Sequence, residues 1–329
     1  MAKGKNAEPP RHAPDGVAAA EHLRGAGWWG IGEKDRRTLA PLTTSGLSVG
    51  VNLNFGKLGL RPALVLARVK GGENLWDVGG EGSFALRSYY SSSLQDVMLA
   101  APPIDIAAYR AFWHAKEEDG TLDTISVRPL EDIRFLTAQI PFFNVERRSF
   151  DFAWDSLPRR VFDEIKGKER QAPFRGDVIF ALNEILKNPT AGSLKDISGA
   201  TGVALDKCSD ATRLVREFPI GWGFHGPEAG QGGLIVYYHS LREDVFGAIR
   251  ASIRNVPYAA LEAWGEDSDG FVYLAELIIP AVALTETIEY IGRVSSVCGD
   301  SFSSGFYEAS QLQSYPLSRK MAVRSGSGN

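Results

Sequence analysis

The sequence predicts an α+β protein in which one β-α-β-β-α-β unit occurs twice, with short helices between the two copies. Three observations lead to this prediction. Apolar residues recur at helical spacing between residues 177 and 218. Strand-like and helix-like apolar runs follow in the same order on both sides of this region. The segments that lead into the two copies, residues 49–55 and 220–225, correspond at an offset of 171 residues, as in a tandem duplication.

The composition is that of a folded protein with two or more domains. The chain has 329 residues, of which 44% are hydrophobic and 23% charged, which excludes a peptide-sized fold and a wholly disordered chain. The net charge of −4 provides no general attraction for a polyanion. The longest apolar run, residues 274–284, is too short to span a bilayer, and residues 1–16 lack the apolar core of a secretory signal. We therefore expect a cytoplasmic protein with no membrane contact.

Three helices with the turns of a helix-turn-helix are predicted between the copies. Residues 177–186 carry an amphipathic apolar stripe. Ser193 then opens a Ser-x-x-Asp capping arrangement, which starts a short helix that ends near residues 199–202. Apolar residues at helical spacing predict a third helix at 205–218. The lengths of both turns favour a helix-turn-helix over a generic helical hairpin.

The second copy of the unit follows these helices. A polar Gly/Asp turn at residues 265–270 separates two strand-like segments, which therefore form a hairpin. The order of elements is that of the ferredoxin-like βαββαβ fold. The predicted elements are a strand at 233–238, a helix at 243–255, strands at 258–264 and 271–279, a helix at 285–297 and a strand at 301–309.

The first copy has the same order of elements, so the fold class is α+β with two ferredoxin-like modules and a helix-turn-helix between them. Its hairpin corresponds to that of the second copy at an offset of 175 residues, from Leu86 to Leu261. The predicted elements are a strand at 63–68, a weak helix at 75–82, strands at 84–90 and 94–101, a helix at 104–116 and a strand at 121–127.

The two sheets are expected to face one another within one chain. An isolated module of this kind leaves one face of its sheet uncovered, and pairing inside the chain covers both faces without a second subunit. The protein is then a monomer with an internal pseudo-dimer. The apolar strand residues expected to cover these faces are Leu64, Leu66, Leu234, Val236, Val272 and Leu274.

The predicted domain organisation has six segments. They are an N-terminal arm or reduced helix-turn-helix at 1–44, the first ferredoxin-like module at 45–155, a charged linker at 156–174, the helix-turn-helix at 175–219, the second ferredoxin-like module at 220–315 and a disordered tail at 316–329.

The helix-turn-helix of residues 193–216, followed by the unit at 233–310, resembles the leucine-responsive/AsnC (Lrp/AsnC) family of prokaryotic regulators, in particular archaeal-type members. Residues 49–60 and 151–155 are similar to related two-module archaeal proteins. The resemblance implies a transcription regulator that binds double-stranded DNA and responds to a small-molecule effector. It implies that the helix at 205–217 is the recognition helix. The DNA-binding candidates are Lys195, Lys207, Ser209, Arg213 and Arg216.

Some residues depart from the pattern of this family. The position that caps the recognition helix holds Ala204, where the family usually has Ser or Thr. Asp206 and Asp210 lie in the first turns of that helix, where their charge opposes the approach of DNA. A first alternative is therefore a factor that docks on a protein or ribonucleoprotein assembly, such as RNA polymerase or the ribosome.

A second alternative is an enzyme like the haem-precursor decarboxylases, in which His225 and His239 would be the acid/base candidates. No catalytic residue is assigned, because no nucleophile and base can be singled out from spacing alone. The five histidines form no metal-binding pair, and Cys208 and Cys298 are expected to be core residues. We therefore expect no metal site and no cofactor.

Overall fold

The structure of the protein is a computed structural model. It describes residues 47–51, 55–56, 59–71, 73–90, 95–136, 143–144, 149–150, 181, 193–217, 220–224, 232–254, 256, 258–279, 283–296, 302–308 and 311–314. The predictions for the N-terminal arm, the charged linker, the C-terminal tail and the helix at 177–186 apart from residue 181 lie outside the described residues.

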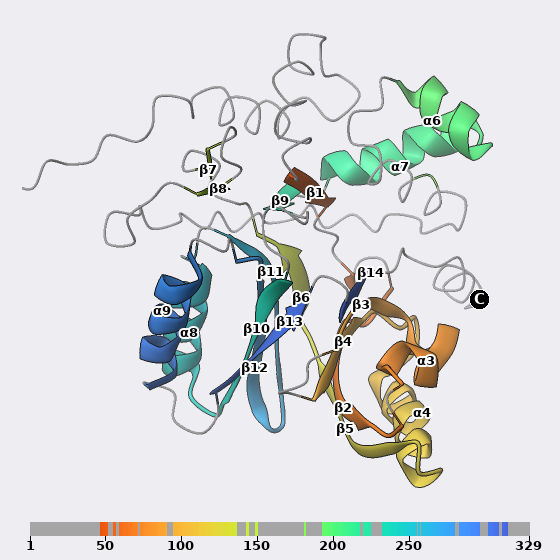
Figure 1. The fold of residues 1–329 in the computed structure, drawn as a ribbon. Coiled ribbons are helices and arrows are strands. Elements are labelled where there is room, and N and C mark those ends of the chain that lie inside the picture. The colour runs from red at the N-terminus through yellow and green to blue at the C-terminus, as the bar shows by residue number, and fades with distance from the viewer. Residues whose placement is uncertain are drawn as a thin grey trace, which may run out of the picture.

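Each copy of the repeated unit forms one module of four strands and two helices (Figure 1). The first module consists of β2 (Ala63–Val69), α3 (Leu75–Gly79) with the 3-10 turn η3 (Gly80–Ser83), β3 (Ala85–Tyr89), β4 (Asp96–Ala100), α4 (Ile106–Glu118) and β5 (Leu122–Pro129). The second module consists of β10 (Gly232–Ser240), α8 (Glu243–Arg254), β11 (Ala259–Asp267), β12 (Gly270–Leu277), α9 (Leu284–Ser296) and β13 (Phe302–Glu308).

The two modules have the same sheet topology. The strands run in the order β5-β2-β4-β3 in the first module and β13-β10-β12-β11 in the second, and all neighbours are antiparallel. Both orders are fourth-first-third-second, which is the ferredoxin-like arrangement, so the predicted fold class is confirmed. The second strand of each module has a register shift at the same place. The shift lies between Ala85 and Arg87 in β3 and between Ala259 and Leu261 in β11. Leu86 of the first module therefore occupies the position equivalent to Ala260 of the second module. The sequence had predicted Leu261, one residue further along the chain.

Each sheet receives a fifth strand from the chain that follows the other module. β6 (Asp132–Phe135) follows β5 but pairs with β11, and β14 (Leu312–Ser314) follows β13 but pairs with β3. The sequence pattern does not indicate these strands, because three or four residues are too few to show an alternating pattern. The exchange ties the two modules together through backbone hydrogen bonds.

A pseudo-two-fold axis relates the modules. The lead-in segments form β1 (Leu47–Val51) and β9 (Ile220–Phe224), which pair with each other in an antiparallel ribbon. Gly50 lies opposite Gly221 in this ribbon, and these two residues correspond at the same offset of 171 that the sequence indicated. A residue that pairs with its own counterpart lies at the axis, so the ribbon marks the centre of the duplication. A second small ribbon joins β7 (Phe143–Asn144) to β8 (Ser149–Phe150).

The modules stack in four layers, with α8 and α9 outside one sheet and α3 and α4 outside the other (Figure 1). The two sheets face each other, as the sequence predicted, and one hydrophobic cluster fills the space between them. Its strand residues include Leu64, Leu66, Tyr89, Val97 and Leu99 from the first module and Ile235, Leu261, Ala263, Val272 and Leu274 from the second.

Two of the residues predicted for this interface face the other way. Leu234 and Val236 pack in the cluster that lies under α8 and α9, while Ile235 between them faces the first module. Successive strand residues point to opposite faces, and the apolar run in β10 is continuous. Its periodicity therefore could not identify the face that each residue occupies. Among the residues that the structure describes, no helix is both long and apolar enough to cross a membrane.

Candidate functional site

Two features of the structure could carry function: a pair of helices outside the four layers and a cavity beside α8. The pair consists of α6 (Leu194–Thr201) and α7 (Leu205–Glu217), which match the predicted second and third helices (Figure 1). The Oγ of Ser193 accepts a hydrogen bond from the Asp196 amide at 3.3 Å, which caps α6 as predicted. Gly202 ends α6 in the left-handed region, with φ of 67°, where a side chain would be strained. Only residues 202–204 separate the two helices.

The helix pair is packed against its surroundings. Ile197, Cys208 and Ala211 are buried and belong to the same hydrophobic cluster that fills the space between the sheets. Burial, together with the charge of Asp206, raises the pKa of the Cys208 thiol, so this cysteine stays protonated at neutral pH. Cys208 is therefore a core residue, as predicted, whereas Cys298 lies outside the described residues.

The predicted DNA-binding residues lie on these two helices. Lys195 and Ser209 are exposed, and the Arg213 side chain is 55% exposed. The Lys207 side chain is 19% exposed, so it is less accessible than those of Lys195 and Arg213. Arg216 lies in α7, but its side chain is outside the described residues.

Acidic residues on the same helix pair with two of these cations. The Lys207 ammonium lies 3.3 Å from the Asp206 carboxylate, and the Arg213 guanidinium lies 3.2 Å from the Asp210 carboxylate. The hydrogen bond from Lys207 lowers the pKa of Asp206, which therefore stays ionised. Both acids that the sequence analysis identified as unfavourable for DNA are thus placed beside the cations that would contact it.

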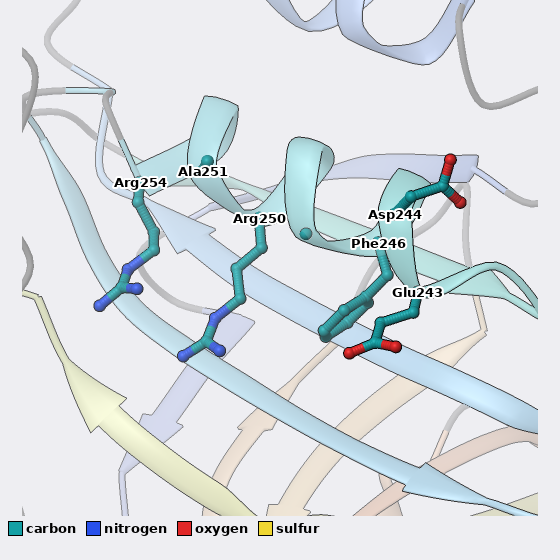
Figure 2. Close-up of a pocket in the computed structure, with 7 residues that line it drawn as sticks. Glu243, Asp244, Phe246, Arg250, Ala251 and Arg254 are labelled. Atoms are coloured by element: carbon teal, nitrogen blue, oxygen red, sulfur yellow. The ribbon is translucent and has the colours of Figure 1, made fainter. Parts of the chain in front are cut away.

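A shallow, open cavity of about 580 Å³ lies along α8 in the second module, and all the residues that line it belong to this helix. Figure 2 shows the side chains of Glu243, Phe246, Arg250 and Arg254 projecting from one side of this helix. Their spacing of three or four residues places them in a row. The row has a carboxylate at the amino end of the helix, an aromatic ring in the middle and two guanidinium groups at the carboxyl end.

The two arginines share one buried carboxylate. Arg250 donates two hydrogen bonds to Glu262, at 2.9 and 3.2 Å, and the Nε of Arg254 lies 3.3 Å from the same carboxylate. Glu262 has no exposed surface, whereas the two arginine side chains are 19% and 16% exposed. The guanidinium of Arg250 also lies 3.7 Å from the centre of the Trp264 ring, which is a cation–π contact.

A third arginine reaches this cluster through the exchanged strand β6. Arg134 lies 4.8 Å from the centre of the Trp264 ring and donates to Asp132 at 2.7 Å. Burial lowers the pKa of Arg254, and the charges of Arg250 and Arg134 lower it further against the opposing effect of Glu262. The three guanidinium groups gather at the carboxyl end of the row with Glu262 and Asp132 as counter-ions, whereas Glu243 and Asp244 place two carboxylates at the amino end. The guanidinium groups at the carboxyl end offer donors that suit a small anion, although the site carries no net positive charge.

The sequence pattern gives little indication of this arginine cluster. Arg250 and Arg254 are four residues apart on a predicted helix, which places them on one face. This four-residue spacing is the signal in the sequence from which the arginine cluster could have been predicted. The contribution of Arg134 depends on the exchange of β6 between the modules, which the pattern of the sequence does not show.

The histidine pair proposed for an enzyme is described only in part. The Nε2 of His239 lies 2.5 Å from the backbone oxygen of Asp269 in the β11–β12 turn. This contact occupies one ring nitrogen of His239. His225 lies outside the described residues, so the meeting of the two imidazoles stays a prediction.

Comparisons with known proteins give structural similarities only. No protein-family model matches the chain, and no curated protein matches it. The crystal structure of the siroheme decarboxylase NirDL has 13% sequence identity and a TM-score of 0.48 and covers 96% of this chain and 93% of its own. The same enzyme in complex with an iron-uroporphyrin III analogue gives 12% identity and a TM-score of 0.47, with coverage of 97% and 94%. An anthrone oxidase-like protein gives 10% identity and a TM-score of 0.35, with coverage of 79% and 96%. At TM-scores below 0.5, none of these structures assigns an activity to this chain.

Proposed function

We propose that this chain is a DNA-binding transcription regulator of the Lrp/AsnC-like type, in which α6 and α7 contact the duplex. The observation that supports the proposal is the geometry of the helix pair. A capped helix of eight residues is joined through three residues to a helix of 13 residues. The second helix is about 20 Å long, which suits insertion into a major groove about 12 Å wide.

The acidic residues of α7 weaken DNA binding without preventing it. An exposed ion pair between residues three apart on a helix contributes only about 0.2–0.5 kcal/mol. Arg213 can therefore leave Asp210 for a phosphate at little cost, whereas the less exposed Lys207 is held more firmly. We expect Lys195, Arg213 and Arg216 to supply the phosphate contacts. Affinity should be moderate, because Asp206 and Asp210 stay close to the duplex.

Fluorescence anisotropy with a pool of mixed-sequence duplexes tests this proposal. Arg213→Glu combined with Arg216→Glu should abolish binding at 50 mM salt while the thermal unfolding midpoint stays within a few degrees of the parent. The matched control is Arg293→Glu, which reverses an exposed arginine on α9, far along the chain from the helix pair. The control should bind as the parent does. Equal binding by the double variant would reject the proposed interface, and a parent that binds no duplex would reject DNA binding and favour docking on a protein or ribonucleoprotein assembly.

A second candidate function is the binding of a small anionic effector in the cavity beside α8. The specific observation in its favour is the cluster in which Arg250 and Arg254 share one buried carboxylate next to that cavity. A ligand carboxylate would accept hydrogen bonds from the guanidinium groups of Arg250 and Arg254, and the ring of Phe246 would provide an apolar wall for the rest of the ligand. The chemical class that fits is therefore a small aromatic or aliphatic carboxylate.

Calorimetric titration with benzoate and with benzyl alcohol separates charge recognition from simple apolar binding. Benzoate should bind, benzyl alcohol should not, and Arg250→Gln should weaken benzoate binding by at least tenfold. The matched control is Arg68→Gln, because Arg68 is exposed on β2 of the first module and does not line the cavity. Equal binding of the two probes, or unchanged affinity in Arg250→Gln, would contradict an anion site.

A further inference from the structure

A buried polar cluster joins the two facing sheets. Arg87 of β3 forms an ion pair and a hydrogen bond with Glu276 of β12, and their side chains are 7% and 0% exposed. Tyr89 and Tyr307 each donate a hydrogen bond to the Glu276 carboxylate at 2.8 Å. Arg87 and Tyr89 come from the first module, whereas Glu276 and Tyr307 come from the second. Burial raises the pKa of Tyr89 to about 12 and raises that of Tyr307 as well, so both hydroxyls keep their protons and act as donors.

The counterparts of these residues under the pseudo-two-fold axis are apolar. The strand registers pair Arg87 with Leu99 in the first sheet and Leu261 with Glu276 in the second. Arg87 therefore corresponds to Leu261, and Glu276 corresponds to Leu99. By the same registers Tyr89 corresponds to Ala263. The interface thus has a charged half, formed by Arg87 and Glu276, and a leucine half, formed by Leu99 and Leu261, which are both buried in the same cluster.

A second ion pair between the modules has the same polarity. Arg128 of β5 donates two hydrogen bonds to Asp267 at the end of β11, at 2.7 and 2.8 Å, and both side chains are 9% exposed. Arg110 of α4 lies 3.6 Å from the same carboxylate. The registers place Gly305 at the position that corresponds to Arg128. In both pairs the first module supplies the cation and the second module supplies the anion.

This polarity makes the pairing of like modules unfavourable. Two first modules joined through the same surface would place each Arg87 against Leu99. Two second modules would place each Glu276 against Leu261. Either arrangement buries two charges without their partners, and loss of one partner from a buried pair lowers an equilibrium constant by roughly 100-fold or more.

We propose that the Arg87–Glu276 and Arg128–Asp267 pairs determine which sheets can pair, so that a first module accepts only a second module. In the intact chain the occupant of the first module's sheet face is the second module of the same molecule. The charged half of the interface selects this partner, and the leucine half supplies apolar contact without selecting. This inference does not depend on DNA binding by α6 and α7.

Charge reversal in the full-length chain tests the proposal. In Arg87→Glu the introduced carboxylate faces Glu276, and in Glu276→Arg the introduced guanidinium faces Arg87. Each variant alone should have a folding equilibrium constant at least 100-fold below that of the parent. When the two variants are refolded together, residue 87 of either chain meets an opposite charge only at residue 276 of the other chain. Each first module should therefore pair with the second module of the other chain. Light scattering should then detect a two-chain particle with twice the 35.8 kDa mass of one chain.

The reversal of both residues in one chain provides the second arm. Arg87→Glu combined with Glu276→Arg should recover at least tenfold of the lost stability and should give a one-chain particle. The matched control exchanges the exposed pair Arg242 and Asp244, which lies within one module. It should change neither stability nor mass. Single reversals with the stability of the parent, a refolded mixture with one-chain particles only, or a double reversal without any recovery would each overturn the proposal.

Discussion

Replacement of Gly265 by alanine should push the two modules apart at a point where their backbones lie close together. A Cβ at Gly265 in β11 would lie 2.5 Å from the backbone oxygen of Pro129 and 2.7 Å from the Cα of Leu130, both in the first module. An ordinary van der Waals contact needs about 3.4 Å or more, so the backbones would have to move apart by about 0.9 Å. The Glu131 amide donates to the Trp264 carbonyl at 2.8 Å next to this point, which prevents an easy shift.

The expected cost follows from the rigidity of these neighbours. Overpacking a close-packed interior costs about 1–3 kcal/mol, and we place Gly265→Ala near 3 kcal/mol because both contacting groups are backbone. Urea denaturation measures the free energy of unfolding. Gly292→Ala in α9 is the control, because a Cβ there meets nothing within 4 Å, and alanine should stabilise that helix by about 0.5–1 kcal/mol. A Gly265→Ala variant as stable as the parent would refute the close contact between the modules.

Three further predictions concern charge. Burial raises the pKa of Asp96 to about 6 in the folded protein, above its unfolded value of 3.8, so the folded state binds more protons between pH 4 and 6 and loses stability as the pH rises through that window. Asp96→Asn should therefore stabilise the protein at pH 7.5 by roughly 1–2 kcal/mol and by little below pH 4, as measured by thermal unfolding at both pH values. An equal gain at both would be inconsistent with titration of this carboxyl. A double-mutant cycle on Arg128 and Asp267 should give a coupling of about 1–3 kcal/mol, against less than about 0.5 kcal/mol for the exposed pair Arg242 and Asp244; similar couplings would contradict the burial of the first pair. Asp206→Asn with Asp210→Asn should tighten duplex binding several-fold at 50 mM salt, as measured by anisotropy, and a decrease would show that these acids assist binding.

The tandem fold could be predicted because its signals are local. The turn at residues 265–270, the Ser193 cap and the helical spacing in α7 each depend on residues that are close in sequence. The duplication could then be predicted because the same local signals occur twice in the same order. Burial on both faces of β10 removed the alternation that would have placed Leu234 and Val236 correctly.

The polar features of the molecule could not be predicted because they depend on distant residues. Glu276 stands in an apolar run and is 189 residues from Arg87 in the sequence, so nothing near either residue indicates an ion pair. The cluster at α8 likewise needs Arg134, which arrives on an exchanged strand of four residues. All five predicted DNA-binding residues lie on α6 and α7, but the sequence could not show that the Lys207 side chain is only 19% exposed.

The salt dependence of duplex binding tests the proposed function most directly. If Lys195, Arg213 and Arg216 contact phosphates, the logarithm of the association constant should fall with the logarithm of salt concentration at a slope of about −2.7. The affinity of the parent protein should then decrease roughly 40-fold between 50 and 200 mM salt, while Arg213→Glu combined with Arg216→Glu shows no measurable binding at either concentration. An affinity that is independent of salt, or the absence of binding at 50 mM, would contradict a DNA interface on α6 and α7.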